Sequence, residues 1–147
     1  MLLQILYYFL LWTFVLYWAH RLGHKISWIR KIHMCHHSYI SQSKSQGWHW
    51  SNIFLYNDTA KSTIDYWITE VLPTILVTLL TKQYWIFAVF YIWAAFFQEA
   101  TEHNKNFNLS PYLSMGKWHM LHHEIGSHNF GVYTTIWDIV FKTNKNV

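Results

Sequence analysis

Histidines are the residues of this sequence whose type and spacing are best suited to chemistry. Eight of them fall into three short clusters, a His-x-x-x-His pair and two His-x-x-His-His triplets. They are His20 and His24, then His33, His36 and His37, and finally His119, His122 and His123. On an α-helix, side chains at positions i, i+3 and i+4 share one face, because a turn takes about 3.6 residues. Helices can therefore aim the three clusters at a common point, and one helix with the triplet spacing can donate to two adjacent metal ions at once.

Clustered imidazoles of this kind predict a metal site. Neutral imidazole binds iron, zinc, copper and nickel well. Eight clustered histidines exceed the three or four ligands that one zinc ion takes, so a pair of metal ions is the simpler account. We expect two further ligands, His103 after a predicted hairpin and His128, which can fold back from His123. His49 lies between two tryptophans and is expected at the membrane interface rather than on a metal.

Other residue types limit the class of site. The single cysteine, Cys35, rules out a disulfide framework and a cysteine-rich zinc or iron–sulfur site, and we expect it to be an apolar filler. No Glu-x-x-His motif occurs, so the sequence does not fit the soluble di-iron helical bundles. Haem ligation by two histidines does not explain why adjacent histidines occur twice, at residues 36–37 and 122–123. Four acids are candidates to orient ligand N–H groups, each with a solvated carboxylate as the alternative. They are Glu99, Glu102, Glu124 and Asp138.

The composition predicts that these clusters lie beside a membrane. Hydrophobic residues make up 52% of the chain and aromatic residues 20%, against 12% charged residues, which suits a protein with aromatic belts at lipid interfaces. Residues 1–19 form an apolar run without a charged side chain, about 29 Å long as a helix and close to one hydrocarbon core. This run lacks a basic start and a small-residue cleavage site, so we expect a retained membrane helix rather than a signal peptide.

A helical hairpin is predicted over about residues 64–98, with a polar turn at residues 81–83. Asn57 or Asp58 is expected to cap its first helix, and Pro73 to kink that helix or to lie in a first turn. The apolar arms are shorter than the ~20 residues of a straight span, unless flanking residues extend them. Both ends of such a hairpin return to one side, which keeps the histidine segments together.

The two polar segments, residues 20–62 and 99–147, carry the histidines. The first holds six Lys or Arg against one acid, which favours the cytoplasmic side, and includes a polar loop at residues 41–47. These cations are spread over loops rather than banded on one helix, so we expect no nucleic-acid partner. In the second, a helix carrying the last cluster begins at Ser110-Pro111 or just after Gly116.

The predicted fold is all-α. We expect a single domain over residues 1–147, an integral membrane helical domain with a histidine-rich helical cap on its cytosolic side. The last stretch, Asn129 to Thr143, is expected as a short amphipathic helix or an extended segment on the membrane.

These motifs, in this order, resemble the fatty acid hydroxylase/sterol desaturase superfamily of integral membrane non-haem di-iron enzymes. The matching stretches are His20-Arg21-Leu22-Gly23-His24, His33-Met34-Cys35-His36-His37 and His119-Met120-Leu121-His122-His123, together with Asn129-Phe130-Gly131 and Trp137-Asp138. In size the chain is nearer the bacterial carotenoid hydroxylases, which it also resembles. Gln98 or Glu99 stands where some members of the superfamily carry another histidine.

The resemblance implies an oxidoreductase whose histidine boxes hold two iron ions and which uses O2 to hydroxylate or desaturate a lipid C–H bond. The implied substrate is an apolar lipid, such as a fatty acyl, sterol-like or carotenoid molecule, that enters from the bilayer. Because no haem, flavin or iron–sulfur motif is visible, we expect an external ferredoxin- or cytochrome b5-like electron donor. The alternative is a non-enzymatic membrane metal-binding or carrier protein, which needs the same histidines. The sequence lacks the acid-lined helices and the histidine-rich flexible loop typical of a carrier.

Overall fold

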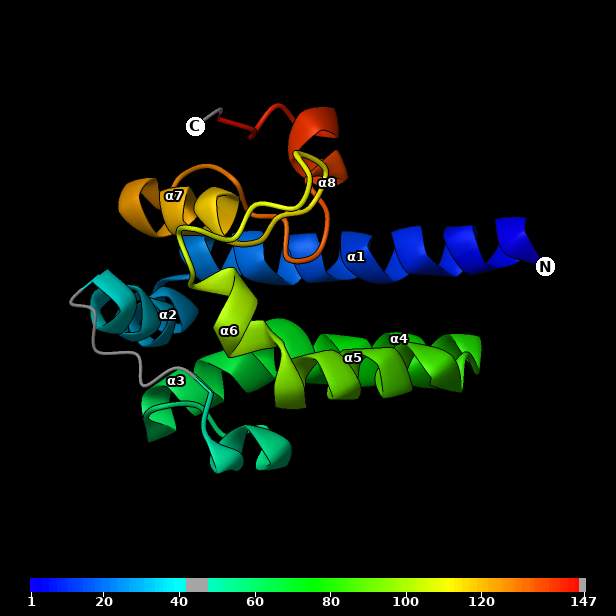
Figure 1. Ribbon diagram of the computed structural model, residues 1–147, viewed down its shortest axis with the longest axis horizontal. Helices are drawn as coiled ribbons and strands as arrows, with labels where there is room; N and C mark the ends of the chain where they lie inside the picture. The colour runs from blue at the N-terminus through cyan, green and yellow to red at the C-terminus, as the bar shows by residue number, and fades with distance from the viewer. Residues whose placement is uncertain (42–47, 146–147) are drawn as a thin grey trace.

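Two long helical rods lie side by side, and shorter helices gather at one end of them (Figure 1). The computed structural model describes residues 1–41 and 48–145, and this part of the chain is all-helical, as predicted. One rod is the helix α1 (Leu2–Lys25), and the other is the hairpin that ends in α4 and α5. Most of the predicted loop at residues 41–47, from residue 42 on, lies outside the described residues.

Helix α1 extends beyond the apolar run from which it was predicted. It continues through His20 and His24 to Lys25, where Ile26 adopts an extended conformation and ends it. The first histidine pair therefore lies on the last turns of the same helix that begins as an apolar rod. After Ile26 the chain forms α2 (Ser27–Ser41), which carries the second histidine cluster.

The second rod begins with the short 3-10 helix η1 (Trp50–Phe54) and a loop, followed by a continuous helix over residues 60–81. Thr59 caps this helix by accepting a hydrogen bond from the Ser62 N–H, so the start was predicted correctly, but neither Asn57 nor Asp58 is the cap. The helix has three parts with different hydrogen bonding. They are α3 (Ala60–Tyr66), a π-helical turn η2 (Trp67–Val71) and α4 (Leu72–Thr81).

Pro73 lies in the first turn of α4, directly after η2, which agrees with the second of its two predicted placements. Lys82 then adopts a left-handed conformation in the predicted turn, with φ +56°, and α5 (Tyr84–Phe96) runs back along α4. Helix α5 has 13 residues and breaks at Phe97 before the short α6. The arms of the hairpin are therefore unequal.

Two helices, α1 and residues 60–81, are long and apolar enough to cross a membrane, whereas α5 is shorter. Between the rods, a core of fully buried side chains from α1 and the hairpin includes Trp12, Leu16 and Phe90. The indole N–H of Trp12 donates to the Thr74 hydroxyl at 2.9 Å, which ties α1 to α4. This packing fixes the end of α1 relative to the hairpin, and so fixes the histidines it carries.

After α6 (Gln98–Glu102) the chain turns without a helix until α7 (Lys117–Ile125). The predicted helix start at Ser110-Pro111 is therefore wrong, and the start just after Gly116 is confirmed. Gly116 has φ +58°, and a Cβ there would lie 1.8 Å from the Phe107 carbonyl oxygen, so only glycine fits this entry into α7.

The closing segment, which the structure describes throughout, contains the short helix that was one of the two forms predicted for it, and no extended segment. Its first part is irregular, and α8 (Ile136–Val140) follows as one short helix. The buried carboxylate of Asp138 accepts the backbone N–H groups of Phe130 and Gly131, each at 2.8 Å. Trp137 donates its indole N–H to Thr13 on α1 at 3.0 Å. These bonds hold residue 130 against the end of α1, next to the histidines.

Candidate metal centre

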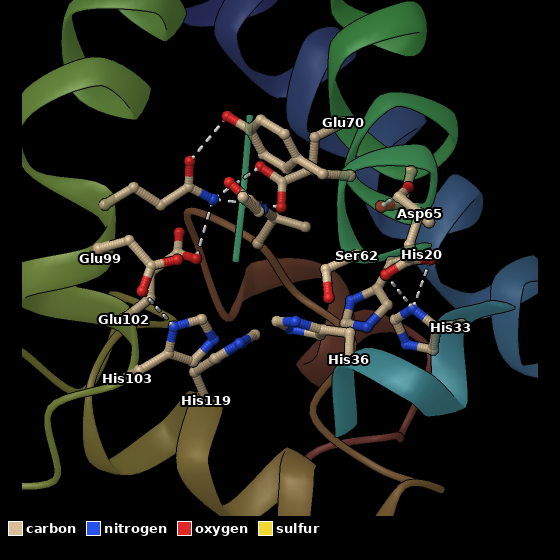
Figure 2. A pocket seen from close by; sticks show the side chains of 15 residues that line it. His20, His33, His36, Ser62, Asp65, Glu70, Glu99, Glu102, His103 and His119 are labelled. Atoms are coloured by element: carbon tan, nitrogen blue, oxygen red, sulfur yellow. Dashed lines mark hydrogen bonds and ion pairs between the residues drawn. The ribbon is translucent and has the colours of Figure 1, made fainter. Parts of the chain in front are cut away.

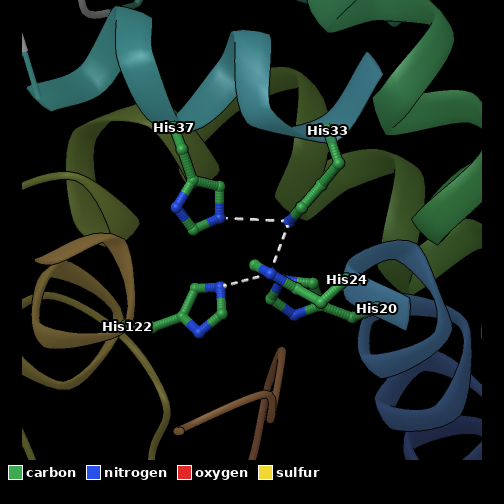
Figure 3. Close-up of side chains that lie close together, drawn as sticks. All are labelled: His20, His24, His33, His37 and His122. Carbon is green, nitrogen blue, oxygen red and sulfur yellow. Dashed lines mark hydrogen bonds between the residues drawn. The ribbon is translucent and has the colours of Figure 1, made fainter. Parts of the chain in front are cut away.

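Nine of the ten predicted ligands gather into two groups, each with its potential ligand atoms within 4.8 Å of one another. The five-histidine group, shown in Figure 3, consists of His20, His24, His33, His37 and His122. The four-histidine group consists of His36, His103, His119 and His123. The groups adjoin, because the His37 and His123 ring centroids are only 4.4 Å apart.

Each His-x-x-His-His triplet contributes to both groups. Helix α2 gives its i and i+4 rings to the five-histidine group and its i+3 ring, His36, to the four-histidine group. Helix α7 does the reverse, since only its i+3 ring, His122, enters the five-histidine group. The shared face of each helix therefore lies between the two groups, the arrangement expected of a helix that donates to two adjacent ions.

The spacing of the ring nitrogens fits a metal coordination sphere. In the five-histidine group, the His24 Nε2 atom lies 2.8 Å from His33 Nε2 and 3.1 Å from His122 Nε2. In the four-histidine group, the Nε2 atoms of His119 and His123 are 2.9 Å apart. For ligands at right angles, metal–nitrogen bonds of about 2.1 Å place neighbouring nitrogens about 3.0 Å apart. The donor set and its spacing therefore suit a transition metal in each group.

The environment of these rings favours their neutral form, which is the form that binds metal. Burial away from water is the main cause that lowers the pKa of four of them well below the ordinary value, and repulsion from a neighbouring imidazolium is the second. They are His36, His119, His122 and His123. Metal binding at neutral pH therefore does not have to displace protons from these rings.

Three rings of the five-histidine group are oriented by acceptors on their Nδ1 side. His33 donates its Nδ1–H to both carboxylate oxygens of Asp65, each at 2.9 Å. His20 donates to the Phe130 carbonyl oxygen at 2.9 Å, and His122 to the His128 carbonyl oxygen at 2.6 Å. A proton held on Nδ1 leaves the Nε2 lone pair free for a metal and fixes the ring plane.

The four-histidine group has fewer such partners. His103 donates its Nδ1–H to the Glu99 carboxylate at 3.2 Å. Glu99 therefore lies where it can orient a histidine N–H group, which is the role considered for it from the sequence. Three buried ring nitrogens have no hydrogen-bond partner in the described structure, namely His103 Nε2, His119 Nδ1 and His123 Nδ1. An unpaired buried polar atom costs about 1–3 kcal/mol. A metal ligand bond would satisfy the His103 Nε2 lone pair.

Three other residues that were considered as ligands or orienting acids lie outside both groups. The ring of His128 lies outside both groups and pairs with Ser127, although its carbonyl orients His122. His49 caps η1, where its Nδ1 accepts from the Ser51 backbone. Glu124 forms an exposed ion pair with Lys105 at 3.0 Å rather than with a histidine.

The two remaining predicted acids also have other partners. Asp138 accepts the backbone N–H groups that hold Phe130, and so acts on His20 only through that carbonyl. Glu102 accepts a hydrogen bond from Gln98 at 3.0 Å. The sequence reasoning missed Asp65, which is the carboxylate closest to the role sought. Its signal was an acid, one of two with Glu70, in a largely apolar helical stretch, because a charge in such a place usually has a functional partner.

A small polar cavity of about 30 Å³ lies between the two groups and the hairpin (Figure 2). Histidines of both groups line it, among them His20 and His119, and carboxylates face them from the other side. Gln98 donates to Glu70 at 3.1 Å and accepts from the Tyr66 hydroxyl at 2.9 Å, so its amide links these polar groups. A cavity of this size holds a water-sized molecule or two, and not a lipid chain.

The described part of the chain is all-helical, with two helices long and apolar enough to cross a membrane and two histidine groups that could each hold a metal ion. The chain belongs to the fatty acid hydroxylase family, which it matches over residues 5–143. The resemblance seen in the sequence is thereby confirmed. The match includes all nine grouped histidines.

One curated relative is methylsterol monooxygenase 1-1 of Arabidopsis thaliana, which is 26% identical to this chain over 158 aligned residues. The alignment covers 99% of this chain and 48% of the relative, so the chain spans about half the length of that protein. No solved structure matches the chain significantly.

Proposed function

We propose that the protein is an O2-dependent membrane oxidoreductase that hydroxylates or desaturates a C–H bond of a lipid. The observation that carries this proposal is the pair of adjoining histidine groups in a chain of the fatty acid hydroxylase family. Ligands come from α1, α2 and α7 and from His103 after α6, so the groups form only when the whole chain is folded. This dependence supports treating residues 1–147 as one domain.

Two iron ions would be held by this chain, one by the five-histidine group and one by the four-histidine group. Iron bound there would supply the redox chemistry that activates O2. The protein's own part is to hold the rings neutral, to orient three of them through Asp65 and two backbone carbonyls, and to keep bulk water out. The cavity of about 30 Å³ has room for a molecule the size of O2 beside both groups.

The reaction requires reducing equivalents from outside. Hydroxylation balances as RH + O2 + 2 e⁻ + 2 H⁺ → ROH + H2O, and desaturation consumes the same electrons and protons while it forms two waters. An external one-electron donor of the ferredoxin or cytochrome b5 kind would supply them. The basic residues near the histidines favour a cytoplasmic location for this end of the molecule.

An apolar lipid suits the surface that surrounds the site. Helix α5 exposes large apolar side chains along its length, such as Val89, Ile92 and Phe96, each about half exposed. Lipid is the medium in which such a surface is stable. The name of the Arabidopsis relative makes a sterol-like lipid the first substrate to test, followed by fatty acyl and carotenoid molecules.

The test is expression in a host without this activity, followed by analysis of its lipids and of the metal content of the purified protein. Wild type is expected to carry about two metal ions per chain and to form an oxidised lipid. His122→Ala removes a fully buried ligand and is expected to abolish the product. His49→Asn is the matched control, because it removes an imidazole outside both groups, and asparagine also caps a helix well.

The outcomes separate the two candidate functions. Wild-type protein that binds two ions and consumes no O2 with reductant and a lipid extract would be a metal carrier. Well-folded wild type with no transition metal would refute both the site and the enzyme.

A further inference from the structure

The five-histidine group reaches the surface at one place. Four of its rings are buried, whereas His24 is only partly buried. His24 lines a cleft of about 230 Å³ at the end of α1. Because its Nε2 atom lies 3.1 Å from His122 Nε2, the ring that meets the cleft also belongs to the group.

The lining of this cleft is strongly basic. Its charged residues are Arg21, Lys25 and Arg30, and no acidic side chain is among the described residues that line it. Lys25 and Arg30 are exposed. Arg21 is fixed in position, since its guanidinium donates to the Tyr17 hydroxyl at 2.9 Å and lies 5.2 Å from the Trp18 ring centroid.

A glycine leaves the edge of the His24 ring open on the cleft side. Gly126 ends α7 with φ +69° and lines the cleft together with Ser127. A Cβ at position 126 would lie 4.0 Å from His24 Cε1, in van der Waals contact with it. Any larger side chain at position 126 would therefore have its Cβ in contact with the His24 ring, which links the cleft to the five-histidine group.

We propose that this basic cleft is the docking surface for a small acidic one-electron carrier protein, and that electrons enter the five-histidine group at the edge of His24. The proposal rests on the proposed function. Each turnover then balances as RH + O2 + 2 reduced carrier + 2 H⁺ → ROH + H2O + 2 oxidised carrier. The carrier loses one electron in each of two dockings, and the four-histidine group receives its electron through the adjoining rings.

Charge and position favour a protein donor over an anionic lipid headgroup. Figure 1 shows the end of α1, with α2 and α7 beside it, at the opposite end of the rods from the α4–α5 turn. If the apolar rods lie in the bilayer, the cleft faces away from it. Complementary charge speeds the encounter of two proteins by 10-fold to 1,000-fold at low salt.

The test measures binding of the soluble domain of cytochrome b5, and separately of a plant-type ferredoxin, to metal-loaded protein in nanodiscs of neutral lipid. The variant is Lys25→Glu combined with Arg30→Glu, which reverses two exposed charges of the cleft. Lys61→Glu is the matched control, because Lys61 is also exposed and lies outside the cleft. Metal content must equal that of wild type in both.

Wild type and Lys61→Glu are expected to bind one of the two carriers with the same affinity, and the double variant about tenfold or more weakly at low salt. The second-order rate at which the reduced carrier is reoxidised should fall by a similar factor. These differences should shrink toward 1 M salt, where the screening length is about 3 Å.

Equal affinities of the double variant and the control for both carriers would overturn the proposal. So would a double variant that loses binding to phosphatidylserine vesicles while its carrier binding is unchanged, since the cleft would then serve a lipid headgroup. Failure of the proposed function would be seen in a different measurement. Wild type supplied with a chemical reductant would then oxidise no lipid.

Discussion

The two histidine groups share helices α2 and α7, yet the protein supports them differently. In the five-histidine group, Asp65 and the carbonyl oxygens of Phe130 and His128 hold three rings in orientation. In the four-histidine group, three buried ring nitrogens have no hydrogen-bond partner in the described structure. The first group is therefore organised by the protein before any ligand binds, whereas the second depends more on its ligand.

The groups also differ in what surrounds them. The five-histidine group meets the basic cleft through His24. The four-histidine group faces the small cavity, where His36, His103 and His119 lie opposite buried carboxylates. The helices that the two groups share thus place one group beside the basic cleft and the other beside the small cavity.

Removal of one ligand from each group is the change with the largest expected effect. His33→Ala should empty the five-histidine group and His119→Ala the four-histidine group, each leaving about one ion per chain, because each ring serves one group. Product formation should fall more than about 100-fold in both. Metal analysis and lipid product analysis measure this. Loss of both ions from either variant would show that the groups form one interdependent site.

Removal of an orienting carboxylate should have a smaller effect that differs between the groups. Asp65→Asn is expected to weaken metal binding by about 10-fold to 100-fold, since Asp65 accepts from His33 with both oxygens. Glu99→Gln replaces a single, longer bond to His103, so its effect should be less than about 10-fold. Competition with a chelator measures both. Equal losses would mean that the two groups are supported alike.

Graded chelation should separate the groups without a mutation. The four-histidine group is expected to lose its ion first, because the Nδ1 atoms of two of its rings, His119 and His123, lack hydrogen-bond partners that would fix those rings. Metal content against chelator concentration should show two steps, and His119→Ala should lack the first. A single step in wild type would contradict the unequal support inferred here.

The smallest expected effect is a loss of stability of the metal-free protein below neutral pH. Burial lowers the pKa of His36, His119, His122 and His123 in the folded chain, whereas unfolded histidines titrate near a pKa of about 6.5. Below that pH the unfolded chain binds more protons than the folded chain. Stability is therefore complete above pH ~6.5 and falls as the pH falls. The melting temperature in detergent between pH 5 and pH 8 measures it.

Much of the fold could be predicted because its signals are local. The apolar run, the capped helix start near Thr59 and the turn at residues 81–83 depend on residues close in sequence. The Ser110-Pro111 cap signal failed because distant contacts decide that loop. The carbonyl oxygens of Pro111 and Tyr112 accept hydrogen bonds from Thr135, which no local pattern reveals.

The candidate site also combines features that local sequence signals predict with features that depend on distant contacts. Helical spacing predicted that each triplet shares a face, and the structure brings those rings together. Their role as metal ligands stays a prediction. Which ring enters which group depends on how α2 packs against α7, and the acceptors of His33 and His20 come from 32 and 110 residues away. Such partners require the tertiary structure.

The π-helical turn η2 separates two tasks within one continuous helix. Before it, α3 directs Asp65 toward His33, and after it, α4 directs Thr74 toward Trp12. One extra residue in a turn rotates everything beyond it by about 100° relative to a regular helix. The π-helical turn therefore sets the angle between the helix face that meets His33 and the face that meets Trp12.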